Sequence, residues 1–229
     1  MATTTTPQLS TCCLQASLWE GTPTGSETTL DGVPNPTYIA YPPSTTTTTP
    51  QTTPPTTANA ILYIHDLLGW TFPNARLAAD ALARATNATV YLPDFLGGEV
   101  IDFDAALAGR FHELDLPGLK ARNARAVREP EVLAYARVLR ESMLVPGDVE
   151  GLRVPVQFLA PELDEVFTPE LKLLAFTALQ KSGVPFDYQH FPGVTHGCLQ
   201  RGNADAKGER AAMVRGHHAL VAWFKQWLQ

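Results

Sequence analysis

The sequence lacks several features that would tie it to a membrane, a nucleic acid or a secretory route. Basic residues are few: 17 Lys and Arg against 23 Asp and Glu give a net charge of −6, which leaves no basic field to attract phosphates. No apolar run approaches the roughly 20 residues that span a bilayer. Residues 1–10 contain neither Lys nor Arg, and no apolar signal core follows them. We therefore expect a cytoplasmic protein that binds neither nucleic acid nor a membrane.

Cysteine is also scarce. Cys12, Cys13 and Cys198 are the only three, and the odd number argues against a disulfide framework. No Cys-x-x-Cys spacing occurs, so the sequence predicts no zinc site. Cys198 lies two residues after a candidate base, His196, and is best explained as a small packing residue rather than a nucleophile.

One segment is nearly free of apolar residues. Residues 44–57 (STTTTTPQTTPPTT) consist almost entirely of Thr and Pro. Such a stretch cannot bury enough surface to offset the entropy of ordering it, so we predict a disordered surface loop. A glycosylated stalk is the alternative, but it would require secretion. The rest of residues 1–229 is predicted to form a single domain.

Apolar runs alternate with helical periodicity along the remaining chain. Residues 60–65 (AILYIH) and 89–92 (TVYL) are typical of strands buried on both faces, and Pro73 opens an amphipathic helix between them. The other predicted strands are residues 37–40, 154–160 and 186–191, and the other predicted helices are residues 131–140, 169–181 and 206–228. This alternation predicts an α/β fold with a doubly wound, mostly parallel sheet.

In such sheets, ligands bind at the carboxyl ends of the strands. Asp164 follows the strand at residues 154–160, and His196 follows the next strand along the chain. An acid and then a histidine in this order are typical of the acid–base half of an α/β-hydrolase triad. Asp164 would hold one ring nitrogen of His196, and the other nitrogen would face the cleft as a general base. The alternative is that both are ordinary surface groups.

Two long stretches resemble the fungal branch of the dienelactone hydrolase family, within the α/β-hydrolase superfamily. They are residues 60–99 (AILYIHDLLGWTFPNARLAADALARATNATVYLPDFLGGE) and 154–229, which include VPVQFLAPELDEVFTPEL, YQHFPGVTHG and RGN. The N-terminal CCLQ and GTPTGSETTLDGVPNPTYIAYP match the same branch. The resemblance implies hydrolysis of small esters or lactones without a cofactor or metal, with Asp164 and His196 as triad acid and base.

The resemblance also implies a role for the loop after residues 60–65. Backbone N–H groups near Leu67 would form part of an oxyanion hole, which stabilises developing negative charge. His65 matches the family loop and is explained equally well as a structural or a substrate-facing residue. Trp70 is explained equally well as cleft lining or core.

The chain departs from the family at the nucleophile, a Cys on a Gly-x-Cys-x-Gly turn. Neither this motif nor Gly-x-Ser-x-Gly occurs. Its expected place is residues 141–153, but thirteen residues cannot hold a strand, elbow, helix and returning strand, which need about 30 or more. Ser142 is the only hydroxyl there, and neither a glycine nor a strand precedes it. We therefore predict that the central strand–elbow–helix–strand unit is missing.

Three hypotheses follow. In the first, the chain is a degenerate or truncated hydrolase-like protein that has lost acyl transfer. In the second, it is a non-covalent acid–base enzyme, such as a cyclase or isomerase, that uses Asp164 and His196. In the third, it is a non-catalytic partner of an intact homologue. The third follows from the apolar surface that the missing unit would expose, and it predicts an oligomer.

Overall fold

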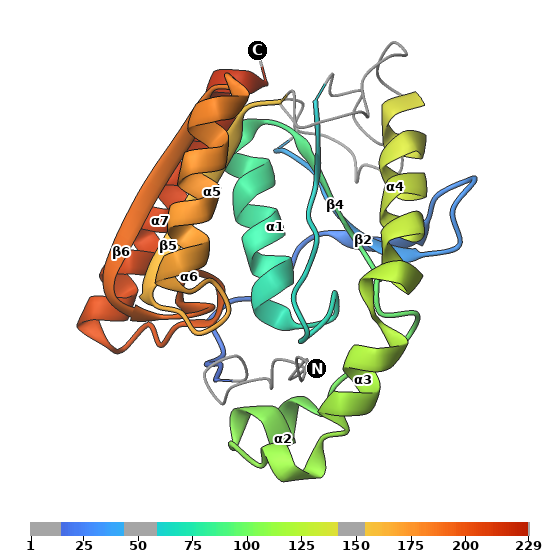
Figure 1. The fold of residues 1–229 in the computed structure, drawn as a ribbon. Helices are drawn as coiled ribbons and strands as arrows, with labels where there is room; N and C mark the ends of the chain where they lie inside the picture. Colours follow the sequence, from blue (N-terminus) through green and yellow to red (C-terminus); the bar gives the residue numbers. More distant parts are fainter. Residues whose placement is uncertain (1–14, 44–58, 142–153, 229) are drawn as a thin grey trace, which may run out of the picture.

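Helices and strands alternate along the chain in a mixed α/β architecture (Figure 1). The computed structural model describes residues 15–43, 59–141 and 154–228. The strands are β1 (Ser26–Thr29), β2 (Pro36–Ala40), β3 (Ala60–Leu62), β4 (Thr89–Pro93), β5 (Val156–Leu163) and β6 (Phe186–Thr195). The helices are α1 (Pro73–Thr86), α2 (Phe103–Leu107), η2 (Phe111–Glu113), α3 (Leu116–Arg122), α4 (Arg125–Glu141), α5 (Pro169–Ser182), α6 (Cys198–Arg201) and α7 (Lys207–Trp227).

Several predictions fall on parts of the chain outside this description. They concern the Thr/Pro-rich loop at residues 44–57, Cys12 and Cys13, Ser142, and nearly all of the connection at residues 141–153. No helix in the described ranges combines the length and apolarity needed to cross a bilayer.

The predicted βαβ unit is confirmed. β3 and β4 run parallel, with Ile61 opposite Val90, and α1 connects them. Pro73 is the first residue of α1, where its missing N–H costs no helical hydrogen bond. The helix ends at Asn87, whose left-handed backbone (φ 57°) lets its N–H bond the Ala83 carbonyl.

The strands form two sheets rather than the single sheet that the sequence predicts. One has the order β1-β2-β4-β3, and the other contains β5 and β6. The pairs β3/β4 and β5/β6 are parallel, but β1/β2 and β2/β4 are antiparallel. The prediction of a mostly parallel sheet is therefore wrong for the N-terminal strands, where a short connection reverses the chain between β1 and β2.

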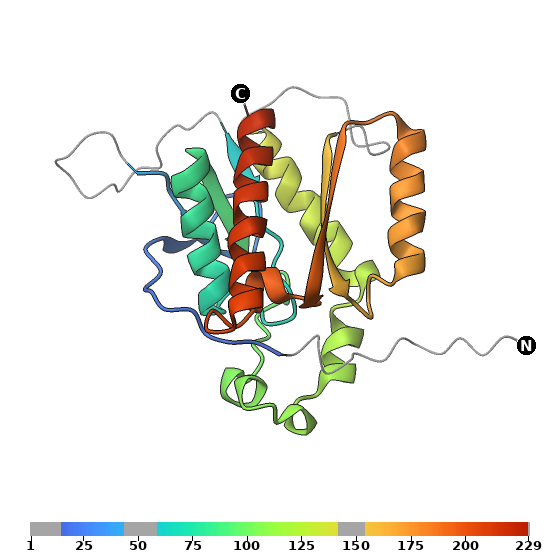
Figure 2. The same cartoon turned by 90° about the vertical axis from the view of Figure 1, so that its left-hand side faces the viewer.

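The long helix α7 connects the two sheets. It packs against α1, which covers the four-stranded sheet, and also against β5 and β6 (Figure 2). The Gln157 amide of β5 donates to the Ala219 carbonyl of α7 at 3.2 Å. At the end of α7, the Leu228 carbonyl accepts from the Asn59 amide just before β3, at 2.5 Å. Helix α7 therefore contacts both sheets and fixes how they lie relative to each other.

Helix α4 lies on the side opposite α7, as both views show. Its Tyr135 is fully buried. The Tyr135 hydroxyl forms a 2.7 Å hydrogen bond with the Thr37 hydroxyl of β2, and its ring packs edge-on against the Phe95 ring. The helix begins at Arg125, not at residue 131 as predicted, and so contains Pro130. Two ion pairs within the helix favour this longer helix: Arg125 with Glu129, just before Pro130, and Arg128 with Glu131, which spans it.

The strand β6 pairs with β5 alone among the described strands. Arg215 of α7 donates to the His190 carbonyl of β6, and its guanidinium carbon lies 3.9 Å from the centre of the Phe191 ring. A carbonyl of this strand is thus satisfied by a side chain instead of by another strand.

Candidate functional site

The loops after β5 and β6 bring Asp164 and His196 together. β5 ends at Leu163 and β6 ends at Thr195, so each residue directly follows its strand. The two strands are parallel neighbours, and the His196 N–H donates to the Leu163 carbonyl at 3.0 Å. His196 Nδ1 lies 2.9 Å from Asp164 Oδ2. The proximity that strand order predicts is therefore observed.

Asp164 is held firmly in this position. Its side chain is 3% exposed, and its Oδ1 accepts hydrogen bonds from the Val166 and Phe167 N–H groups at 2.9 and 2.8 Å. Burial by itself raises the pKa of the carboxyl, but the Phe167 N–H and the His196 ring outweigh it, so the pKa is lowered. Asp164 is thus a fixed carboxylate aimed at the imidazole.

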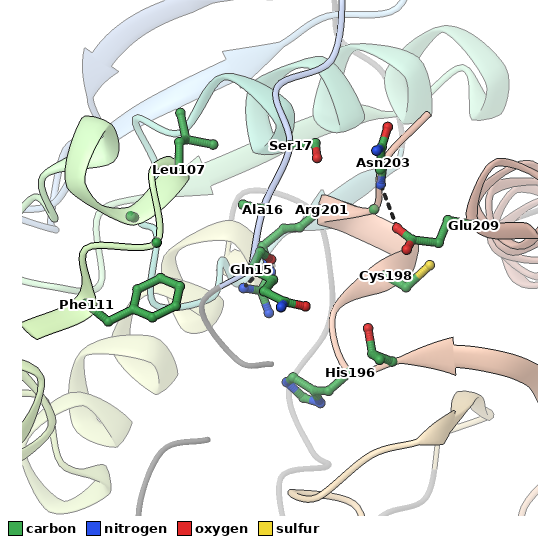
Figure 3. Close-up of a pocket in the computed structure, with 14 residues that line it drawn as sticks. Gln15, Ala16, Ser17, Leu107, Phe111, His196, Cys198, Arg201, Asn203 and Glu209 are labelled. Atoms are coloured by element: carbon green, nitrogen blue, oxygen red, sulfur yellow. Dashed lines mark hydrogen bonds between the residues drawn. The ribbon is translucent and has the colours of Figure 1, made fainter. Parts of the chain in front are cut away.

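His196 is more open than its partner, with a side chain 32% exposed. Since Nδ1 faces Asp164, Nε2 is left to face the surroundings, and the ring makes no other hydrogen bond to the described part of the chain. His196 borders a cavity of about 310 Å³, whose other walls include Ser17, Phe111 and Arg201 (Figure 3). The imidazole can therefore reach a small molecule or a water in this cavity.

Cys198 borders the same cavity but is not directed at the histidine. In Figure 3 its sulfur points away from the His196 ring. The residue is 3% exposed and packs with Phe191 and Val194. Burial, and next the charge of Glu209, raise the pKa of its thiol to about 11. The packing role predicted for Cys198 is confirmed.

Leu67 lies in a tight turn after β3. The Asp66 carbonyl accepts from the Gly69 N–H at 3.0 Å, and Asp66 Oδ1 accepts from the Leu68 N–H at 2.9 Å. Within the described residues the Leu67 N–H has no acceptor, so it remains available to a ligand. Leu67 borders a second, largely apolar cavity of about 560 Å³ together with Phe95 and Leu119.

His65 has a structural role in this loop. Its Nε2 accepts the Phe95 N–H at 3.1 Å, and its Nδ1 lies 2.8 Å from the Asp66 carbonyl, to which it donates. This pair of bonds requires a neutral ring, and burial lowers the pKa of His65. Both ring nitrogens are engaged, so the structure favours the structural explanation over the substrate-facing one. His65 ties the loop after β3 to the loop after β4.

Trp70 does not face either cavity. It is 8% exposed within the main core, and the Arg76 guanidinium stacks over its ring at 5.0 Å. The structure therefore favours the core interpretation of Trp70 over the cleft-lining one. The chain turns back toward α1 after Gly69, and this turn directs the indole into the core.

Sequence reasoning missed Arg201, which lies on α6 and borders the His196 cavity. It is 3% exposed, and its Nε lies 2.8 Å from Asp66 Oδ2. Asp66 in turn borders the larger cavity, so this ion pair stands where the two cavities approach each other. Arg201 belongs to the RGN motif, but nothing in the sequence identifies its partner.

No cluster of three or more potential metal-ligating side chains occurs among residues 15–43, 59–141 and 154–228. The arrangement instead offers a carboxylate-supported imidazole, a free backbone N–H and a buried guanidinium around two cavities. These groups can move a proton and stabilise negative charge on a neutral or anionic ligand.

Comparison with curated proteins gives relatives over nearly the whole chain. The chain is 26% identical to "Hydrolase pyvD" of Aspergillus violaceofuscus, over 96% of this chain and 97% of the relative. It is 24% identical to "Dienlactone hydrolase 2" of Gibberella moniliformis, over 95% and 94%. It is 27% identical to the "Carboxymethylenebutenolidase homolog" of Mus musculus, over 74% and 82%. No family model matches the chain.

The fungal alignments are longer than the chain itself. They extend over 252 residues for the Aspergillus relative and 238 for the Gibberella relative, whereas the chain has 229 residues. Because nearly the full length of each relative is covered, each relative holds residues that have no counterpart in this chain.

Proposed function

Since this chain is a relative of the dienelactone hydrolases, we propose that it is a hydrolase-like protein that binds a small ester or lactone beside Asp164 and His196 but forms no acyl-enzyme. The observation that carries the proposal is the 2.9 Å contact between His196 Nδ1 and Asp164 Oδ2, with the His196 ring making no other hydrogen bond to the described ranges. The pair has the arrangement of the acid–base half of a triad, and the sequence contains no Gly-x-Cys-x-Gly or Gly-x-Ser-x-Gly turn for the other half.

The roles follow from the geometry. Asp164 orients the imidazole and stabilises its charged form, and His196 Nε2 then accepts a proton from water or from a bound ligand. To the Leu67 N–H we assign the role of a donor to a developing oxyanion, as the family resemblance implies. Arg201 holds that loop through Asp66.

Three observations support the absence of a nucleophile. The sequence contains neither a Gly-x-Cys-x-Gly nor a Gly-x-Ser-x-Gly turn. The Cys198 thiol is buried and has a raised pKa. The fungal relatives hold residues that this chain lacks. We infer that the missing residues include the strand–elbow–helix–strand unit.

The test is single-turnover hydrolysis of p-nitrophenyl acetate with mass spectrometry of the protein. We expect no burst of p-nitrophenolate and no acetyl adduct at His196 or any cysteine. Any slow turnover should fall to the background rate in His196→Ala and should persist in the matched control His112→Ala, whose side chain is 81% exposed. A stoichiometric burst with an acyl adduct, both lost in His196→Ala, would overturn the proposal.

A second candidate is non-covalent acid–base catalysis on a carbon acid, as in a cyclase or isomerase. It is favoured by the partial exposure of His196 on a cavity that also contains the buried Arg201, because a cation there would stabilise an enolate. The measurement is deuterium exchange at the α-carbon of small lactones and keto esters, followed by NMR. Exchange that is equally fast with wild-type protein and His196→Ala would reject this candidate.

A further inference from the structure

Residues 15–19 (QASLW), which we call the N-terminal strap, form one wall of the cavity beside His196. They belong to no helix or strand. The first three residues of the strap border the cavity of about 310 Å³ that also contains His196. Figure 3 shows the strap passing between the turn that carries Phe111 and the helix α6. A segment far from His196 in the sequence therefore helps to shape the site.

The strap is held in place by hydrogen bonds to α1 and α6. The Ser17 N–H donates to the Arg201 carbonyl at 3.0 Å. The side-chain amide of Asn74, a fully buried residue of α1, donates to the Ser17 carbonyl at 2.7 Å and accepts from the Trp19 N–H at 2.9 Å. The Trp19 indole donates to the Gly202 carbonyl at 3.3 Å. The strap therefore has a defined position beside the cavity.

The side-chain amide of Gln15 faces this cavity. In Figure 3 it points into the space between His196 and Cys198. The Gln15 carbonyl accepts from Arg201 Nη1 at 3.5 Å, which ties the residue to α6. Its side chain makes no hydrogen bond to the described part of the chain. Because an amide carries two N–H donors and a carbonyl acceptor, this group can bind a ligand hydroxyl either as donor or as acceptor.

Two further polar side chains on the cavity wall are available to a ligand. The hydroxyl groups of Ser17 and Thr195 make no hydrogen bond within the described ranges, and both residues border the cavity. The cavity beside Leu67, in contrast, is largely apolar. Covering polar groups with an apolar ligand leaves them unpaired, which costs binding free energy. The cavity beside His196 therefore favours a ligand with oxygen groups of its own.

The charged groups around the cavity favour a neutral ligand over an anionic one. The Arg201 guanidinium is already paired with Asp66. Glu209 also borders the cavity, and its carboxylate accepts from the Asn203 N–H at 2.7 Å. The fixed charges therefore leave no surplus of positive charge for an anion, and a second carboxylate would be repelled by Glu209.

Given the proposed binding of an ester or lactone beside His196, on which this inference rests, we propose that the ligand is a neutral, hydroxylated small lactone or ester and that Gln15 is the residue that determines this specificity. The Gln15 amide forms a hydrogen bond with a ligand hydroxyl, and the N-terminal strap holds the amide in place. The cavity of about 310 Å³ lies at the small end of the range for ligand sites, roughly 300–1,000 Å³, which favours a single ring.

The probes are D-galactono-1,4-lactone and γ-butyrolactone, which share a five-membered lactone ring but differ in hydroxyl groups. Each is titrated into the full 229-residue chain, and the His196 ring signal, assigned by its loss in His196→Ala, is followed by NMR. We expect the hydroxylated lactone to bind about tenfold more tightly, and this preference to fall to about twofold in Gln15→Leu. The affinity for γ-butyrolactone should not change in Gln15→Leu. The matched control Gln180→Leu, an exposed residue of α5 outside the cavity, should keep the full preference.

The outcomes separate this proposal from the proposed function. If neither lactone shifts the His196 signal, both are overturned. Equal binding of the two lactones by the wild-type chain leaves the proposed function standing but overturns the hydroxylated ligand. A preference that persists in Gln15→Leu, or that is lost equally in Gln180→Leu, overturns the role of Gln15. Tighter binding of 5-oxotetrahydrofuran-2-carboxylate, an anionic lactone with the same ring, overturns the choice of a neutral ligand.

Discussion

Arg201 Nε lies 2.8 Å from Asp66 Oδ2, so a buried guanidinium at the end of α6 holds the turn after β3. The contact joins residues from the two separate sheets. Arg201 borders the cavity beside His196, and Asp66 borders the cavity beside Leu67. The position of the Leu67 N–H relative to His196 thus depends on this ion pair.

Replacing Arg201 by Met should destabilise the protein strongly. The substitution keeps most of the aliphatic stem but leaves Asp66 without its cation, and breaking a buried ion pair costs about 3–5 kcal/mol. We expect the lower end of this range, because the Asp66 side chain is 29% exposed. Urea unfolding measures the change. Arg122→Met is the control, since Arg122 is 53% exposed and surface pairs contribute about 0–1 kcal/mol. An equal loss of unfolding free energy in the two variants would show that the buried ion pair contributes no more than a surface pair.

Asp164 should make stability depend on pH in the acid range. Its folded pKa is lowered, so the charged carboxylate contributes stability above the unfolded value of about 3.9, and this contribution is lost as pH falls through the lowered folded pKa. In Asp164→Asn the amide oxygen can still accept from Val166 and Phe167, but the charge is gone. We expect the difference in free energy of unfolding between wild type and Asp164→Asn to shrink between pH 6 and pH 2.5. A constant difference over this range would contradict the assignment.

His65 should contribute stability only while its ring is neutral. Its folded pKa is lowered by burial, so the contribution is complete above the unfolded pKa of about 6.5 and is lost as pH falls toward the folded value. His65→Ala leaves the Phe95 N–H without an acceptor, which costs about 1–3 kcal/mol at pH 7.5. The cost should decrease from pH 6.5 to pH 5, measured by urea unfolding. His112→Ala should have little effect at pH 7.5, and a cost for His65→Ala that does not change with pH would refute the neutral-ring assignment.

Cys198 should resist alkylation in the folded protein. Raising the pKa of this thiol to about 11 lowers its ionised fraction at pH 7.5 on the order of 100-fold, and the thiolate is the reacting form. In a Cys12→Ser, Cys13→Ser background, iodoacetamide followed by mass spectrometry should label Cys198 only after addition of urea. Rapid labelling of the native protein, together with loss of any ester hydrolysis, would identify Cys198 as a reactive residue after all.

The strands β2 to β6 and the helices α1, α5 and α7 are predictable from the sequence, because burial leaves a periodic apolar pattern. β1 is not, since its residues SETT are all exposed and polar, and it forms by pairing with β2. The start of α3 has a local sequence signal in Asp115, which caps the helix by accepting from the Gly118 N–H. A cap of this kind precedes only a short helix, so periodicity alone does not reveal it.

In the candidate site too, some contacts are predictable from the sequence and others are not. Asp164 and His196 were predicted to meet because parallel neighbouring strands end at the same edge of a sheet. The partners of His65 and Arg201 could not be predicted, because Phe95 and Asp66 reach them only through tertiary packing. Likewise the periodicity of α5 places Leu171 and Leu174 on a buried face, but it cannot show whether the neighbour that would bury them is present.

The guanidinium of Arg215 occupies the His190 carbonyl of β6 in place of a neighbouring strand. One outer margin of the molecule carries this cation, and the other is the short, fully polar strand β1. Both features discourage lateral growth. The outer strands of the two sheets are therefore poor templates for edge-to-edge aggregation of the folded protein.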